Sequence, residues 1–377
     1  MSIAKERKEF YLKKLEEKKE GIVRGIPLYH TFPKLASIIP VIPPGYQVLW
    51  TGNSGTGKTQ TWMGIILYSV YKAKKMKLND TRTILVITLL EDTKEMFIDR
   101  LYSMFFYELF GEVVDGFELQ SFKQDLSEEK IKKLDEIEKE IDFLLEDCEI
   151  IDNVYNATGL YKWCRSISNK YGTHHMKEKE FTKEDKSTYI ETVYSHYTLT
   201  DPKTQFLLIV DNLNNLQQES RDGRLMSQLE CINLWSRSYC RLQIAKHWQW
   251  SILNVIQQAS DSEKQQFDYK GNSIIEKIKP SLDGLGNSKE CQRDHFIVFG
   301  IFAPDRYGIK EYPEESGYDI SLLRDNYRSL IILKSNLSKT NIEIPFYFNG
   351  ACSLLRELPK PNEMMQVYNK IRNNQNI

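Results

Sequence analysis

The sequence predicts an α/β fold: a mainly parallel, twisted sheet with helices on both faces. Three features of the sequence lead to this prediction. Short apolar runs are typical of buried strands, helical segments lie between most of them, and a glycine-rich loop joins one strand to the next helix. Strands that alternate with helices form parallel sheets whose two faces are covered. The chain has 377 residues, 41% of them apolar, which is enough for one large domain or two small ones.

The ends of the chain differ from its middle. Residues 1–25 are expected to form a helical arm or linker, because their charges leave few apolar positions and such a helix buries little alone. Residues 26–360 are expected to form the main domain, with a polar, aperiodic surface insertion at about 173–204. His174 and His175 in that insertion are expected to be solvated. A C-terminal tail should cover 361–377.

The first strand and helix of the main domain enclose a recognisable loop. The apolar segment YQVLW (46–50) predicts a buried strand, and the amphipathic segment 58–75 predicts a helix. Between them, TGNSGTGKT satisfies the pattern G-x-x-x-x-G-K-[ST], in which backbone N–H groups surround phosphates, the lysine reaches the β- and γ-phosphates and the hydroxyl binds Mg²⁺. We therefore expect a nucleoside triphosphate to bind through Gly52, Asn53, Ser54, Gly55, Thr56, Gly57, Lys58 and Thr59.

The remaining elements follow in alternation. Apolar runs predict further strands at 81–92, 148–152, 205–216, 250–258 and 295–304, and a closing hairpin-like pair at 329–336 and 343–350. Helical patterns lie between these runs, at 93–111, 127–147, 158–172 and about 226–247.

Strand-end carboxylates are candidates to complete the nucleotide site. Asp211 ends an apolar strand, where it would hold Mg²⁺ together with Thr59 at the carboxyl edge of the sheet. Glu91 and Asp92 compete for the role of general base. The sequence DTKE offers Asp92 as a helix N-cap with Glu95 reaching back, so we assign Glu91 as the residue that activates water.

Two glutamines end the strand at 250–258. Gln257 or Gln258 could sense the γ-phosphate and report it to the adjoining loop. An equally simple interpretation is that both are ordinary polar residues at a strand end.

The order of these motifs resembles the C-terminal ATPase domain of DnaB-type replicative helicases, which are RecA-like ATPases. The resemblance covers about Thr31 to Leu358 and rests on segments in the family's order: FPKLASIIPVIPPGYQVLWTGNSGTGKT, ILVITLLEDTKEMFIDRLYSMF, FLLIVDNLNNL, LNVIQQAS, SLDGLGNSKECQRDHFIVF, LIILKSN and PFYFNG. It implies a RecA-like P-loop NTPase core that binds ATP and Mg²⁺. A single-domain version is what we expect of a phage or mobile-element replication gene.

The resemblance also implies roles for particular residues. The catalytic glutamate falls on Glu91, the phosphate-sensing glutamine on Gln257, and the lysine that reaches a neighbouring subunit's γ-phosphate on Lys334. Gly286 and Glu290 match the second DNA-binding loop. The chain departs from the family at Asn336, which stands where an arginine would accompany that lysine, and the family's usual basic residue near 283–285 is missing. Lys339 and Arg328 are possible substitutes for the missing arginine.

These features together predict an ATP-dependent DNA helicase or translocase that acts on single-stranded DNA in DNA replication. The chain is expected to form a ring, which we expect to be a hexamer. A primase or a loader is expected as a further partner. Alternatives are a RecA-like recombinase, or a slow ATPase that serves as a loader or structural ring component. Low sequence specificity is expected, because a translocase binds the phosphate backbone of DNA electrostatically. Candidate DNA contacts are Arg221, Arg224, Lys264, Lys270, Lys277 and Lys279.

Composition places limits on the partners and the compartment. Lys plus Arg number 51 and Asp plus Glu 52, so any DNA contact must come from a local patch. Six cysteines without a C-x-x-C pair suit reduced thiols in a cytoplasm, that of the host if the gene is phage-encoded. No apolar run approaches the ~20 residues of a membrane span, so no membrane partner is expected.

Overall fold

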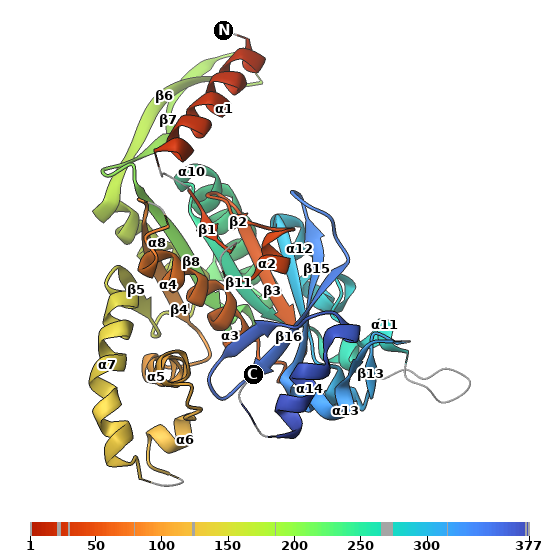
Figure 1. Cartoon of the computed structure of the whole chain (residues 1–377). Helices are drawn as coiled ribbons and strands as arrows, with labels where there is room; N and C mark the ends of the chain where they lie inside the picture. The colour runs from red at the N-terminus through yellow and green to blue at the C-terminus, as the bar shows by residue number, and fades with distance from the viewer. Residues whose placement is uncertain are drawn as a thin grey trace.

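A mixed sheet forms the centre of the computed structural model (Figure 1). The structure describes residues 2–20, 24–28, 31–78, 80–122, 125–184, 186–264, 274–314, 316–373 and 375. Within them the sheet has nine strands, in the spatial order β17 (Leu354–Glu357), β16 (Ile342–Asn349), β15 (Tyr327–Ser335), β12 (Ile297–Phe302), β3 (Gln47–Gly52), β11 (Ser251–Gln257), β8 (Thr204–Asp211), β4 (Arg82–Leu89) and β5 (Cys148–Ile151).

Neighbouring strands from β12 to β5 are all parallel, whereas β15, β16 and β17 extend the sheet by antiparallel pairing. The predicted closing pair is thus present, and β17 is an additional strand. Parallel register brings Gly52 beside Gln257 and Leu89 beside Asp211. The predicted site residues therefore meet at one edge of the sheet.

Helices cover both faces of the sheet (Figure 1). Alternate strand residues face opposite sides, so Leu85 and Ile87 join one apolar core while Ile84 and Val86 join the other. The first core is covered by α2 (Pro33–Ala36), α3 (Lys58–Trp62), a π-helical turn at Met63–Leu67, α4 (Tyr68–Lys75), α5 (Lys94–Phe110) and α7 (Glu128–Leu145). The second core is covered by α8 (Ala157–Tyr171), α9 (Gln228–Asn233), a π-helix at Leu234–Ala245 and α10 (Lys246–Trp248).

Short elements complete the domain. They are the helices α6 (Gly116–Leu119), α11 (Ile275–Ile278), α12 (Lys289–Asp294) and α13 (Ile320–Leu323), and the paired strands β1 (Ile26–Pro27) with β2 (Val41–Ile42), β9 (Ser220–Arg221) with β10 (Arg224–Leu225) and β13 (Glu311–Tyr312) with β14 (Tyr318–Asp319). The predicted C-terminal tail includes α14 (Met365–Arg372), which contacts α13, and Met364 is fully buried beside it. This part of the tail is packed on the domain.

The surface insertion differs in form from its prediction. Within it, β6 (Gly172–Thr182) and β7 (Thr188–Leu199) pair as a long antiparallel ribbon, so these residues are not aperiodic. The many β-branched and aromatic residues in TYIETVYSHYTL are the strand signal that the sequence interpretation missed. His174 is not simply solvated either: its ring nitrogens lie 2.8 Å from Arg165 Nη1 and 2.7 Å from Ser168 Oγ. Partial burial lowers the pKa of His174 to about 4.

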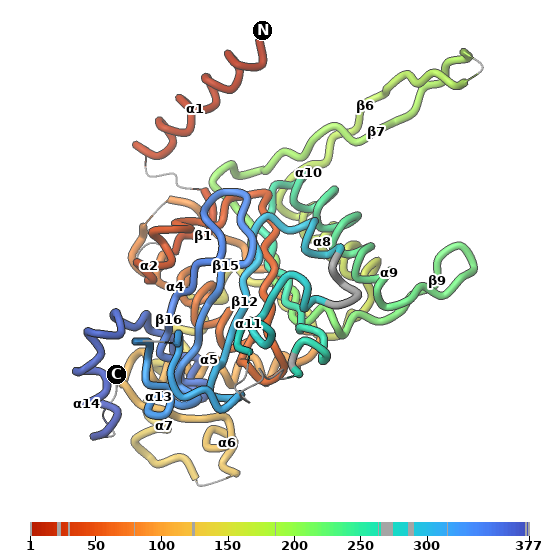
Figure 2. The backbone as a smooth tube through the Cα atoms, turned by 90° about the vertical axis from the view of Figure 1, so that its right-hand side faces the viewer, coloured from red at the N-terminus to blue at the C-terminus, as the bar shows by residue number. Residues whose placement is uncertain are grey.

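The N-terminal helix α1 (Ile3–Lys19) stands apart from the domain. No residue of α1 is buried, and apolar side chains such as Ile3 and Tyr11 are 85% and 59% exposed. Figure 2 shows α1 and the β6–β7 ribbon leaving the same end of the molecule in different directions. The six cysteines are all free, and five of them are buried. No helix in the described part of the chain has the length and apolar character needed to cross a membrane.

Candidate functional site

The predicted phosphate loop runs from the buried strand β3 into α3. Gly55 and Gly57 have φ angles of +66° and +81°, a left-handed conformation that side chains with a Cβ rarely adopt. Lys58 Nζ donates to the backbone oxygen of Asn53 at 3.2 Å, so the ammonium lies over the loop. The helix N-terminus and the glycine conformations are those that an anion-binding loop requires.

The predicted metal ligands are brought together across the sheet edge. Thr59 Oγ1 donates to Asp211 Oδ2 at 2.7 Å, and Asp211 is only 4% exposed. Burial raises the pKa of Asp211, while hydrogen bonds from Thr59 and Trp62 act in the opposite direction. A hydroxyl and a carboxylate oxygen at this spacing fit the hard oxygen donors that Mg²⁺ prefers.

Glu91 lies next to this pair. It follows β4, is exposed, and its Oε2 accepts a hydrogen bond from Asn212 Nδ2 at 3.3 Å. Asn212 directly follows Asp211, so the amide places the Glu91 carboxylate beside the candidate metal ligands. An exposed carboxylate at this edge can reach a water molecule near a bound phosphate.

The structural role predicted for Asp92 is wrong. The N-cap of α5 is Thr93, whose hydroxyl accepts from Met96 N at 3.3 Å. Asp92 instead pairs with Arg100, with oxygen–nitrogen distances of 2.5 and 3.2 Å. Burial raises the pKa of Asp92, and Arg100 opposes that change. Asp92 is still committed to a structural contact, but to an ion pair rather than to the helix cap.

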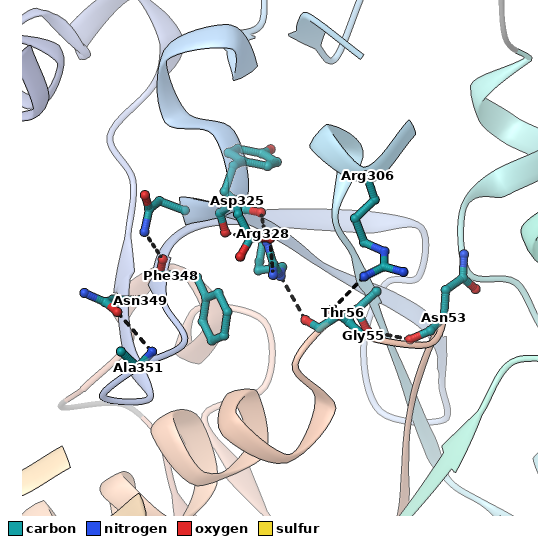
Figure 3. A network of polar contacts seen from close by, with 11 residues as sticks. Asn53, Gly55, Thr56, Arg306, Asp325, Arg328, Phe348, Asn349 and Ala351 are labelled. Atoms are coloured by element: carbon teal, nitrogen blue, oxygen red, sulfur yellow. Dashed lines mark hydrogen bonds and ion pairs between the residues drawn. The ribbon is translucent and has the colours of Figure 1, made fainter. Parts of the chain in front are cut away.

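Two arginines support the outer side of the phosphate loop (Figure 3). Arg306 Nη1 donates to Gly55 O at 3.1 Å, and Arg328 Nε donates to Thr56 O at 2.8 Å. Arg328 is 2% exposed and also binds Asp325, with its guanidinium 4.5 Å from the Phe348 ring centre. These contacts hold Arg328 buried against its own loop, which disfavours the predicted role of Arg328 as a substitute for the missing arginine.

The two glutamines at the end of β11 have different environments. Gln257 is partly exposed and lies beside Gly52, and its backbone N–H donates to Asn214 Oδ1 at 2.7 Å. Gln258 is 2% exposed and its amide donates to Thr51 Oγ1 and to Ser281 O, both at 3.1 Å. Gln257 is therefore the more accessible of the two glutamines, whereas Gln258 joins the β3 strand to the segment after α11.

Lys334 lies far from its own phosphate loop. Lys334 pairs with Val298 of β12, and Val298 pairs with Leu49 of β3. Leu49 lies three residues before Gly52, so Lys334 is displaced from the phosphate loop by about 10 Å along the strand direction. Its Nζ donates to Gln292 O at 2.8 Å. Partial burial lowers the pKa of Lys334. Lys334 is therefore placed away from the phosphate loop of its own chain.

Most of the candidate DNA-binding cations are paired within the chain. Arg224 forms an ion pair with Glu230 on the exposed β9–β10 hairpin, and Lys264 pairs with Asp261 at 2.6 Å. The Lys279 side chain is only 16% exposed and contacts Glu276 at 2.7 Å and Glu343 at 3.0 Å, which disfavours a role in DNA contact. Gly286 lies in a 3-10 turn at Asp283–Ser288, and Lys270 lies outside the described residues.

Sequence interpretation missed Trp62 and Arg306 at this site, and it gave Arg328 a different role. Trp62 occurs three positions after Thr59, a spacing that places both on one face of a helix, and this was an available signal. Neither arginine belongs to a local pattern, because each meets the loop from more than 250 residues away, at separations of 251 and 272.

Comparison with known proteins shows the fold. No family profile and no curated protein matches the sequence. Among solved structures, the chain is similar to the ATPase domain of G40P, with a TM-score of 0.65 and 16% identity over 95% of this chain and 99% of that one. It is also similar to a DnaB-like replicative helicase whose interactions with primase were described, with a TM-score of 0.62 and 17% identity over 92% of this chain and 68% of that one. The predicted RecA-like α/β fold is confirmed.

Proposed function

We propose that this chain, which has the fold of a replicative-helicase ATPase domain, is an ATP-dependent helicase or translocase that acts on single-stranded DNA. One observation carries the proposal: the 2.7 Å contact between Thr59 of the phosphate loop and Asp211 at the end of β8. That contact joins a triphosphate cradle to a candidate metal ligand, and Glu91 lies beside both. ATP binding and hydrolysis need these groups in this arrangement.

Each residue of the site would have a distinct role in ATP binding and hydrolysis. The backbone N–H groups of 53–59 and the Lys58 ammonium would bind the phosphates, and Gln257 would sense the γ-phosphate. Thr59 and Asp211 would hold Mg²⁺, which when bound offsets charge on the phosphate oxygens. Glu91 would accept a proton from the attacking water. An exposed side chain suits this role, because the proton must leave the site after each turnover.

A ring of identical subunits would complete the site. Lys334 cannot reach its own loop, so it would act at the loop of a neighbour, within a ring that we expect to be hexameric. The exposed apolar side chains of α1 support contact between subunits, since a helix with no buried residue gains stability by packing on a partner.

Single-stranded DNA would be bound through the β9–β10 hairpin and the segments around 259–290. Arg221 and Arg224 are both exposed on the hairpin, with side chains 64% and 71% accessible. Backbone phosphates would attract them without regard to base sequence, so affinity should fall steeply with salt. A primase or a loader remains part of the proposal as a protein partner.

The experiment is to measure ATPase activity with and without single-stranded DNA, together with fork unwinding, on the purified chain. We expect DNA-stimulated hydrolysis and unwinding, both lost in Lys58→Ala, and a closed ring by native mass spectrometry. Strand exchange without unwinding would support a recombinase instead. Arg221→Glu with Arg224→Glu should reduce DNA stimulation, whereas Lys279→Glu, a change within an internal ion pair, should chiefly lower stability.

A slow ATPase that acts as a loader or structural ring component is the second candidate. The observation that favours it is the position of Asn336 together with the burial of Arg328. Lys334 would then be the cation offered to the neighbouring site from this strand, and a lone ammonium lacks the planar bidentate geometry of arginine. Turnover that stays slow at saturating DNA, with no unwinding, would select this candidate.

A further inference from the structure

The Asp211 carboxylate receives a second hydrogen bond, which the binding of phosphate and Mg²⁺ by a phosphate loop does not require. The indole Nε1 of Trp62 donates to Asp211 Oδ2 at 2.8 Å, the same oxygen that accepts from Thr59 Oγ1 at 2.7 Å. Trp62 is fully buried and Asp211 nearly so. A hydrogen bond to an ionised acceptor in such surroundings is stronger than one between neutral groups.

The position of Trp62 is well defined. It is the last residue of α3, one helical turn after Thr59, so both donors approach Asp211 from one face of the same helix. Its ring stacks on Phe97 of α5, with centroids 6.3 Å apart and planes 17° apart. The indole is thus held by the first core, and its N–H is directed across to β8.

We infer that Trp62 is a positioning residue, which fixes the orientation of the Asp211 carboxylate so that it can hold Mg²⁺ in the nucleotide site. Two donors on Oδ2 restrict rotation of the carboxylate and leave Oδ1 for the metal or one of its water ligands. Groups that orient a metal ligand in this way commonly contribute a factor of about 10 to 100 in metal affinity. This inference rests on the nucleotide site of the proposed function, but not on DNA binding or unwinding.

Trp50 provides a matched control. It is also fully buried, and its indole Nε1 donates to Thr61 Oγ1 at 3.0 Å, on the helix that carries Trp62. No contact joins Trp50 to Asp211 in the described structure. Trp50→Phe therefore removes a buried indole N–H from the same region without altering the candidate metal ligand.

The experiment is isothermal titration calorimetry of ADP into the full chain, in EDTA and at a series of Mg²⁺ concentrations. For Trp62→Phe we expect ADP affinity in EDTA within about twofold of the parent, and a Mg²⁺ requirement raised about 10- to 100-fold. Trp50→Phe should keep the parental Mg²⁺ requirement. In an Asp211→Asn background, Trp62→Phe should have no further effect on that requirement.

An unchanged Mg²⁺ requirement in Trp62→Phe would overturn the inference, as would equal changes in both tryptophan variants. If Trp62→Phe does not fold, 3-benzothienylalanine at position 62 keeps the bicyclic ring and removes only the N–H donor, and the same shift is expected. A parent chain whose ADP affinity does not respond to Mg²⁺ would also overturn it. A parent that responds to Mg²⁺ but shows no DNA-stimulated hydrolysis would refute the proposed helicase and leave the Trp62 test intact.

Discussion

Glu91 and Asp92 are adjacent carboxylates with different environments, and their amide variants should therefore fail in different ways. Glu91 is exposed and contacts Asn212, whereas the Asp92 side chain is 12% exposed and paired with Arg100. Glu91→Gln keeps a polar side chain but removes the proton acceptor. Asp92→Asn leaves the Arg100 guanidinium, itself 26% exposed, without its charge partner.

The two magnitudes can be worked out separately. Loss of a general base lowers the rate about 10²- to 10⁴-fold, and an exposed amide substitution changes the free energy of unfolding by less than about 0.5 kcal/mol. Loss of the half-buried ion pair should cost about 1–3 kcal/mol. At about 2.1 cal/mol/K per residue, unfolding this 377-residue chain has an entropy of about 0.8 kcal/mol/K, so Tm should fall by roughly 1–4 °C.

The assay combines steady-state ATP hydrolysis, nucleotide binding by calorimetry and thermal unfolding of each variant. Glu91→Gln should bind ATP, fail to hydrolyse it and keep the parental Tm. Asp92→Asn should hydrolyse ATP and melt earlier. The exposed Glu95→Gln, at the start of α5, controls for loss of a nearby negative charge. If Asp92→Asn abolishes hydrolysis while Glu91→Gln retains it, the assignment of the base is reversed and the reasoning fails.

Two further predictions concern assembly and pH. Lys58→Ala subunits lack a working phosphate loop but keep Lys334, and Lys334→Ala subunits have the opposite defect. Mixing these two inactive variants should therefore restore part of the ATPase activity. Co-assembled rings that stay inactive would place Lys334 outside the shared site. His295 is fully buried, its Nδ1–H donates to Cys291 O at 2.7 Å, and burial lowers its pKa to about 3. Its folded pKa lies below the unfolded value of about 6.5, so the unfolded chain binds more protons between these values and stability falls as pH drops. From pH 7 to 5 the loss should be about 2 kcal/mol by denaturant unfolding, and His295→Gln should reduce this slope; an unaltered slope would contradict the neutral state of His295.

Local patterns determined much of what could be predicted. The phosphate loop depends on residues adjacent in sequence, and the strand ends at Glu91 and Asp211 depend on apolar runs followed by an acid. Parallel strands share one carboxyl edge, so these local features were enough to predict that Thr59, Glu91 and Asp211 would meet. Where local signals competed, prediction failed: Asp92 and Thr93 are both good N-caps, and in the folded chain Thr93 caps α5 while Asp92 pairs with Arg100.

The sequence by itself thus determined the class of fold, the loop and the acids at the sheet edge, because each follows from residues within one element. The tertiary structure alone decided which distant side chains support that site. Trp62 meets Asp211 across 149 residues and Arg328 meets Thr56 across 272. The tertiary structure also pairs Lys279 with Glu343, so that Lys279 is mostly buried and is not an exposed cation. Such contacts arise from the packing of separate elements. The spacing of Trp62 from Thr59 places both on one helix face, but no pattern in the chain specifies that the Trp62 N–H meets Asp211.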